Sequence, residues 1–437
     1  MTISSTSTDY ANPYRPWPIK LYNKLPQFRS DEALFDPDKL FEFAKRKTGE
    51  SQLSSAPLME PLAELCKAIR EEARLSAFGK IIQQTRLKNL IVNRLRLDAL
   101  MRQHPEILRQ PEPEIIAIVG LARTGTTLLH RTLAADPEAR TLPSWETLNP
   151  APLPGEAKGD ASKRVKLGTS AAKFLDWLAP DFSAVHPLNA TEPEEDILLL
   201  DLTFFSQTAE AVMHVPSYSA WLEHQDHRPA YEYLRDVLKT LAWLRPRKHW
   251  VLKTPNHSEQ LGPLLSVFPN ATIVQTHRDP METMASCCSL MAHSQGLSSD
   301  HVNAHAIGKH WLRKAAIMAQ KASDARKNNP DVSFVDIYYN QLISDPNTAI
   351  TAIYKAHGYV LDDERKQAIQ KALQRPKPHA SKRHVYNLSD FGLAASDIDS
   401  ALGEYRSQYS IPQQGLPYDE SETKIRQSTK RNPYRYR

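Results

Sequence analysis

Residues 120–127, Gly-Leu-Ala-Arg-Thr-Gly-Thr-Thr, gather two glycines, one cation and three hydroxyl side chains within eight positions. Gly120 and Gly125 allow the backbone to turn and to approach a ligand closely. Arg123 supplies a planar guanidinium that suits phosphate or sulfate oxygens. The stretch follows five apolar residues, 115–119, and precedes an amphipathic segment, so it joins a buried strand to a helix. The first backbone amides of that helix are free donors, and the stretch therefore predicts an anion site.

The glycine spacing is that of a P-loop, but Thr126 stands where a nucleoside triphosphatase needs lysine. Two glycines alone would indicate only an ordinary strand-to-helix turn. Arg123, Thr126 and Thr127 between a strand and a helix favour the anion site instead.

Two further cations follow predicted strands. Residues 249–253, His-Trp-Val-Leu-Lys, place Lys253 at the carboxyl edge of a parallel sheet, where such folds bind ligands. Residues 271–276 form another buried strand, and Arg278 follows it, with Ser286 eight residues later in the next predicted helix. Each residue alone could serve a turn or the surface, but their order along the chain favours a shared site.

The motif at 120–127 resembles the 5′-phosphosulfate-binding loop of sulfotransferases, which use 3′-phosphoadenosine 5′-phosphosulfate (PAPS). Bacterial sulfotransferases with a long helical N-terminal region are the most similar. The resemblance implies PAPS as co-substrate, without a metal, and transfer of its sulfuryl group to the hydroxyl, or in second place the amine, of a small-molecule acceptor. The implied ligands of the 5′-phosphosulfate are Gly120, Arg123, Thr124, Gly125, Thr126 and Thr127.

The same resemblance implies roles for later residues. Lys253 would contact the reacting phosphosulfate, and Arg278 with Ser286 would bind the 3′-phosphate. Tyr339 would pack beside adenine. Lys382 and Arg383 would close over the 3′-phosphate, although a solvated charge run is an equal alternative.

The catalytic base has two candidates. Glu146 lies near the position of the glutamate base of tyrosylprotein-type sulfotransferases, and a helix cap or an arginine pair is its alternative role. His186 and the run Pro-Glu-Glu-Asp at 193–196 resemble a block in the bacterial enzymes, which leaves a functional role for these acids as the alternative. The acids of this run, Glu194, Glu195 and Asp196, are predicted to be structural, in the first turn of a helix capped by Thr191.

Two other functions remain open. A small-molecule kinase or nucleotide hydrolase could use the same loop, but the missing lysine and the absence of a convincing magnesium carboxylate disfavour it. A non-catalytic nucleotide-binding protein could keep the sheet and transfer nothing.

These motifs require an α/β fold with a P-loop-like parallel sheet flanked by helices and a helical N-terminal extension. We predict an arm and helical extension over 1–110, a catalytic domain over 111–395, and a C-terminal helix with a basic tail over 396–437. Apolar residues recur at helical spacing across 59–101, whereas residues 1–30 are expected to form a loose arm.

Composition limits the remaining possibilities. The net charge of +5 suits an anionic ligand, but the chain has no long basic run that would predict nucleic-acid binding. Three cysteines, Cys66, Cys287 and Cys288, form no disulfide framework and no metal-ligand spacing, which fits the cytoplasm. No transmembrane segment or signal peptide is expected. The sequence leaves the oligomeric state and the acceptor open.

Overall fold

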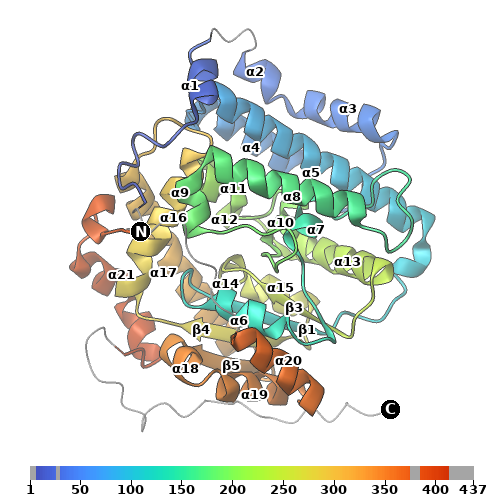
Figure 1. Ribbon diagram of the computed structural model, residues 1–437, viewed down its shortest axis with the longest axis vertical. Coiled ribbons are helices and arrows are strands. Elements are labelled where there is room, and N and C mark those ends of the chain that lie inside the picture. Colours follow the sequence, from blue (N-terminus) through green and yellow to red (C-terminus); the bar gives the residue numbers. More distant parts are fainter. Residues whose placement is uncertain (1–5, 26–29, 375–383, 413–437) are drawn as a thin grey trace.

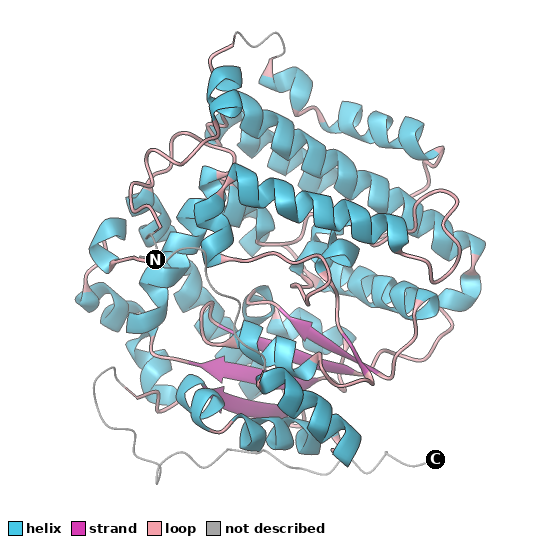
Figure 2. Cartoon of the chain, viewed as in Figure 1, coloured by secondary structure: helices cyan, strands magenta, loops and turns pink. Residues whose placement is uncertain are grey.

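The centre of the fold is a sheet of five parallel strands in the order β2-β3-β1-β4-β5 (Figure 2). The computed structural model describes residues 6–25, 30–374 and 384–412. The strands are β1 (Ile115–Gly120), β2 (Ala139–Arg140), β3 (His249–Lys253), β4 (Thr272–His277) and β5 (Ser333–Tyr338). The predicted α/β class and parallel sheet are confirmed.

Strand β1 lies in the middle of the sheet, and its register sets the position of the loop that follows. Ile118 pairs with Lys253 of β3, and Gly120 pairs with Thr276 of β4. Because the strands are parallel, their carboxyl ends meet at one edge. The loop after β1 therefore begins between Lys253 on one side and Thr276 on the other.

Both faces of the sheet are buried. Successive residues of a strand point to opposite faces, and β1 follows this rule: Ile116 and Ile118 join one apolar cluster, while Ile115 and Ala117 join another. The first cluster includes side chains of α6 (Thr126–Leu133) and α19 (Pro346–His357). A continuous apolar run, such as residues 115–119, is typical of a strand covered on both faces.

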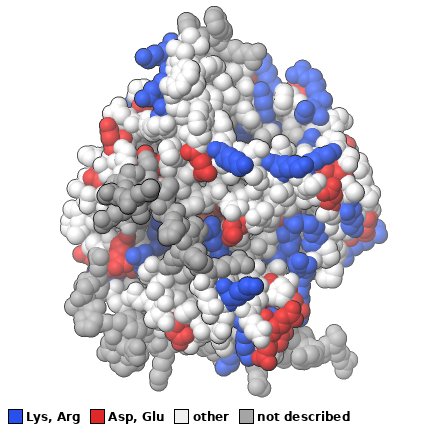
Figure 3. Space-filling model, viewed as in Figure 1, with Lys and Arg blue, Asp and Glu red and all other residues white. Residues whose placement is uncertain are grey.

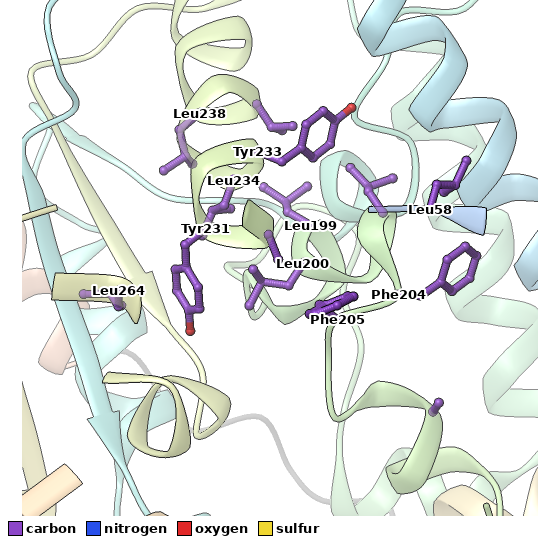
Figure 4. Close-up of a cluster of buried hydrophobic side chains, with 14 of the residues drawn as sticks. Leu58, Leu199, Leu200, Phe204, Phe205, Tyr231, Tyr233, Leu234, Leu238 and Leu264 are labelled. Atoms are coloured by element: carbon purple, nitrogen blue, oxygen red, sulfur yellow. The ribbon is translucent and has the colours of Figure 1, made fainter. Parts of the chain in front are cut away.

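The second cluster extends from the sheet into the helical N-terminal region (Figure 1). Figure 4 shows part of it, where Leu199 and Leu200 lie against Tyr231 and Leu234. The helices before the sheet are α1 (Trp17–Asn23), α2 (Asp31–Leu34), α3 (Pro37–Thr48), α4 (Met59–Glu72), α5 (Ala77–Gln103) and η1 (Pro105–Ile107). The predicted helical set over 59–101 is confirmed as α4 and α5.

A second group of helices lies between β2 and β3 in sequence. They are α7 (Ser144–Leu148), α8 (Ser162–Leu178), α9 (Pro180–Val185), α10 (Ile197–Leu200), η2 (Asp201–Thr203), α11 (Thr208–Val212), α12 (Pro216–Glu223) and α13 (Arg228–Leu244). The later helices are α14 (Asn256–Glu259), α15 (Leu261–Val267), α16 (Pro280–Gly296), α17 (Ala304–Asn328), α18 (Tyr339–Ser344), α20 (Asp363–Leu373), η3 (Leu388–Phe391) and α21 (Ala395–Gln408).

The expectation of a loose N-terminal arm is wrong for residues 6–25. Tyr10 is buried, its ring lies 5.1 Å from that of Phe391, and its hydroxyl is 2.9 Å from Ser289 Oγ of α16. Arg15 is buried and pairs with Asp300 at 2.9 Å. Tertiary contacts therefore give a defined structure to a segment for which composition alone predicted a loose arm.

Within the parts of the chain that are described, no helix combines the length and the hydropathy needed to cross a membrane.

Candidate active site

Glycine is required at both ends of the loop between β1 and α6. Gly120 has φ +133°, and a Cβ there would lie 2.5 Å from Thr276 Oγ1. Gly125 has φ +94°, and its Cβ would lie 2.9 Å from the ring of Tyr339. Neither position accepts a side chain, because both the backbone conformation and the close neighbours exclude it.

Thr124 fastens this loop to the sheet. Its buried hydroxyl donates to the Leu121 carbonyl at 2.7 Å and lies 2.6 Å from Thr276 Oγ1. The Thr124 hydroxyl therefore makes its hydrogen bonds within the protein, and the backbone amide of Thr124 is the group available to a ligand.

The amino end of α6 completes the anion site. The first intrahelical donor is the Leu129 amide, which bonds to the Gly125 carbonyl, so the amides of 126–128 lie before the first helical hydrogen bond. Thr126 is buried and Thr127 is exposed at this end. The geometry therefore concentrates donors and positive potential where the sequence predicted an anion.

Arg123, Arg278 and Tyr339, which come from three separate segments, lie close together. The Arg123 Nε donates to Ser286 Oγ at 3.0 Å, and Arg278 approaches the Arg123 carbonyl at 3.4 Å. The Arg278 guanidinium lies 4.1 Å from the centre of the Tyr339 ring, and its Nε donates to Glu282 at 2.5 Å. Burial lowers the pKa of Arg123, so a bound anion would find a guanidinium with few competing water molecules.

Lys253 lies at the opposite side of the loop, at the end of β3. Its side chain is 3% exposed, and its Nζ is 2.5 Å from Glu195 Oε1. Its backbone amide donates to Asp196 Oδ1 at 2.8 Å. The two consecutive carboxylates therefore hold both the backbone and the ammonium of this lysine.

A buried chain of polar groups stands behind Lys253. Asp196 Oδ2 is 2.8 Å from His257 Nε2, and His257 Nδ1 is 2.8 Å from the Tyr231 hydroxyl. Burial alone would raise the pKa of Asp196, but the charge and hydrogen bond of His257 outweigh it, so the pKa is lowered. The network keeps a carboxylate charged beside Lys253.

His186 pairs with Glu194, the first of the three consecutive acids at 194–196. Its Nε2 is 3.5 Å from Glu194 Oε2, and its side chain is partly exposed. Burial opposes ionisation of Glu194, but His186 and Lys253 lower its pKa to about 2. A histidine held by an ionised carboxylate is a chemically competent proton acceptor.

The prediction that residues 191–196 cap and begin a helix is wrong, because α10 begins only at Ile197 and Asp196 makes no side-chain cap. The three acids instead contact His186, Lys253 and His257. The sequence analysis preferred a structural role for Glu195, and its contact with Lys253 makes it a further candidate site residue. The sequence feature that could have indicated this role is the run of three acids at 194–196, which follows the candidate base His186.

Glu146 occupies a different environment. It is buried in α7, and its two carboxylate oxygens lie 2.6 Å from Arg140 and 2.7 Å from Arg245. Arg140 pairs with Trp250 in the sheet, three residues before Lys253 along β3. Both oxygens are therefore paired with arginines, of which Arg140 is buried.

We expect Glu146→Gln to lower the free energy of unfolding by about 3 kcal/mol, because two arginines lose their buried counter-charge. Turnover per folded molecule should change little. Denaturant unfolding measures the first quantity. Glu192→Gln is the control, because Glu192 lies 3.9 Å from Arg131 in a partly exposed pair and should change stability by less than about 0.5 kcal/mol. Normal stability with a hundredfold loss of turnover would make Glu146 the base after all.

Lys382 and Arg383 lie outside the described residues. The chain is described again from His384, whose Nε2 is 3.0 Å from Ser289 Oγ. Burial, with the charge of Arg123 as the next cause, lowers the pKa of His384 to about 4. This segment therefore returns close to the predicted 3′-phosphate ligands.

Within the described ranges, no group of three or more His, Cys, Asp or Glu side chains is arranged to hold a metal ion. Cys66, Cys287 and Cys288 are all buried.

Fold and candidate site together define an α/β protein with a P-loop-like turn at one edge of the sheet, with Lys253 on one side of the turn and Arg278 on the other. Comparison with known proteins then gives the family: residues 113–363 match the profile of the Sulfotransferase family, and the chain belongs to it. The resemblance inferred from the sequence is confirmed.

Two solved structures are similar over most of the chain. Sulfotransferase STF1 from Mycobacterium tuberculosis H37Rv is 30% identical, with a TM-score of 0.74, and the match covers 86% of this chain and 100% of STF1. Sulfotransferase STF9 from Mycobacterium avium is 25% identical, with a TM-score of 0.76, over 87% of this chain and 98% of STF9.

A third relative is similar in sequence. The omega-hydroxy-beta-dihydromenaquinone-9 sulfotransferase Stf3 of Mycobacterium bovis is 24% identical over 257 residues, and so is Stf3 of Mycobacterium tuberculosis. The match covers 56% of this chain and spans 62% of the length of these relatives.

Proposed function

We propose that this protein transfers the sulfuryl group of PAPS to a hydroxyl of a small molecule, or in second place to an amine. The observation that carries the proposal is the meeting of Arg123, Ser286 and Arg278 beside the glycine turn. PAPS is the usual sulfuryl donor of the family. Its two anionic ends need two separate groups of donors.

The loop amides, Arg123, Thr126 and Thr127 would bind the 5′-phosphosulfate, and Arg278 with Ser286 would bind the 3′-phosphate. Ser286 now accepts from Arg123, and Glu282 pairs with Arg278. A phosphate would compete for both cations, and charge-assisted bonds to it are strong. Tyr339 lies under Arg278, so its proposed packing beside adenine is limited to the part of the ring that Arg278 leaves uncovered.

In the proposed reaction, the acceptor oxygen forms a bond to sulfur while the bond from sulfur to the bridging oxygen breaks. The electron pair of the broken bond stays on the 5′-phosphate, which becomes part of adenosine 3′,5′-bisphosphate. Lys253 stabilises the charge that develops on that oxygen. The acceptor proton passes to Glu195, which lies beside Lys253, or to His186.

We propose hydroxylated apolar molecules as the first acceptors to try, since Stf3 is named for an omega-hydroxy menaquinone. The kinase or hydrolase alternative has no loop lysine for a γ-phosphate. Magnesium-dependent ATP turnover would support that alternative. PAPS binding without turnover on a broad acceptor panel would support a non-catalytic nucleotide-binding protein.

Calorimetry with adenosine 3′,5′-bisphosphate tests the donor site. We expect the wild-type chain to bind it, and Arg278→Ala to weaken binding about 10 to 100-fold, because a charge-assisted contact is lost. The same substitution should change the affinity for adenosine 5′-phosphosulfate far less, because that nucleotide lacks the 3′-phosphate. Arg228→Ala is the control, because Arg228 is exposed and pairs only locally with Glu232. If the folded wild-type chain does not bind the bisphosphate, the proposed function fails.

A further inference from the structure

Helices α1 and α8 leave much of several large apolar side chains exposed in the described part of the chain. Trp17 is 76% exposed and Leu21 57% exposed on α1, while Phe174 and Trp177 are each 47% exposed on α8. Removing such side chains from water is favourable. Scattered exposed residues need no explanation, but a contiguous group does.

The two helices form one surface through a chain of aromatic contacts. The ring of Tyr22 lies 6.2 Å from that of Phe78, which lies 6.5 Å from that of Phe174. Phe174 is in turn 5.6 Å from Trp177. We call this surface the α1–α8 face. Its exposed apolar members are Trp17, Leu21, Leu25, Leu167, Phe174 and Trp177.

Lysines stand between the apolar residues on the same outward sides. On α1 and just after it, Lys20 and Lys24 are exposed, one helical turn apart. On α8, the exposed lysines are Lys163, Lys166 and Lys173. Figure 3 shows blue side chains along α8 and beside α1. Asp176 is an exposed acid of α8.

This combination points to one kind of occupant. Tryptophan, leucine and flanking lysine are the residues with which helices lie in the interface of an anionic bilayer. A second copy of the chain is a poorer occupant. In a two-fold dimer the same face meets itself, so the lysines of one copy would oppose those of the other.

The face is also connected along the chain to one of the proposed bases. Helix α8 ends at Leu178, and α9 then leads directly to His186. A small cleft beside α9 is lined by Tyr14, Phe182 and His293, the last of these from the carboxyl-terminal half of α16. The face is therefore joined through α9 to His186, one of the two proposed bases.

We propose that the α1–α8 face docks the protein on the surface of a membrane that contains anionic lipid. The inference goes beyond the proposed function and does not need it, since docking requires neither PAPS nor turnover. The apolar side chains would enter the headgroup region, and the lysines would pair with lipid phosphates.

Vesicle co-sedimentation tests the proposal. The full chain should bind vesicles of phosphatidylcholine mixed with phosphatidylglycerol, and it should bind pure phosphatidylcholine at least about tenfold more weakly. The double variant Trp17→Ser, Trp177→Ser should bind the mixed vesicles at least about tenfold more weakly. Lys166→Glu with Lys173→Glu should also weaken binding, and added salt should abolish the difference between the two vesicle types.

Val360→Ser is the matched control, because Val360 is 82% exposed and is not a member of the face. Unchanged affinity for adenosine 3′,5′-bisphosphate would show that the variants are folded, and a wild-type chain that binds vesicles but not this nucleotide would contradict the proposed function alone. The membrane proposal is overturned if the wild-type chain does not bind mixed vesicles, or if the face variants bind like wild type. It is also overturned if sedimentation without lipid finds a dimer that the tryptophan variant dissociates.

Discussion

Replacing Lys253 by alanine is expected to lower sulfuryl transfer about 100-fold or more, measured as turnover of PAPS with the best acceptor from a panel. The lysine is fixed at the end of β3 by Glu195 and by the bond of its backbone amide to Asp196. A cation held in place in this way needs little reorganisation when charge appears on the leaving oxygen. Because that charge is larger in the transition state than in bound PAPS, affinity for PAPS should fall much less than turnover.

The control for this experiment is Lys248→Ala, which removes a partly exposed lysine directly before β3 that lies 3.3 Å from Glu138. It should leave turnover within about twofold, as expected for a surface pair. Lys253→Arg keeps a cation at the same strand end and should retain more activity than alanine. Equal losses of turnover and of nucleotide affinity in Lys253→Ala would contradict the assignment, since they would mean uniform binding rather than transition-state stabilisation.

The donor side of the site follows from the sequence because its determinants are local. A run of β-branched residues makes β1, Gly120 and Gly125 shape the turn, and the helix starts where the glycines end. Lys253 and Arg278 each stand at or just after the end of a strand, and parallel strands bring their carboxyl ends to one edge. Local patterns and one topological rule therefore suffice for these positions.

The acceptor side does not follow, because its determinants are contacts between distant segments. The acids at 194–196 have the composition of a helix start, yet Pro193 pairs with Pro143 in an isolated bridge and α10 begins later. Nothing in the spacing of Glu195 reveals that it contacts Lys253, 58 positions away. The packing of Tyr10 on Phe391 is of the same kind, since no local pattern pairs them.

Glu195→Gln is expected to lower turnover about 10² to 10⁴-fold, the range for loss of a positioned general base. Glutamine keeps the size and one acceptor oxygen of the side chain but no longer takes a proton. The carboxylate lies 2.5 Å from Lys253 Nζ and is partly exposed, so it can face both the leaving group and an incoming hydroxyl. Nucleotide affinity should stay within about threefold, because the proposed phosphate ligands are other residues.

His186→Ala decides between the two remaining bases. If Glu195 accepts the proton, this variant should lose less than about tenfold, since His186 would then only pair with Glu194. A larger loss in His186→Ala than in Glu195→Gln would give the proton to His186. The profile of turnover against pH separates the two further, because acidification inactivates an imidazole base at a higher pH than a carboxylate base. Full activity in both variants would mean that neither Glu195 nor His186 is the base.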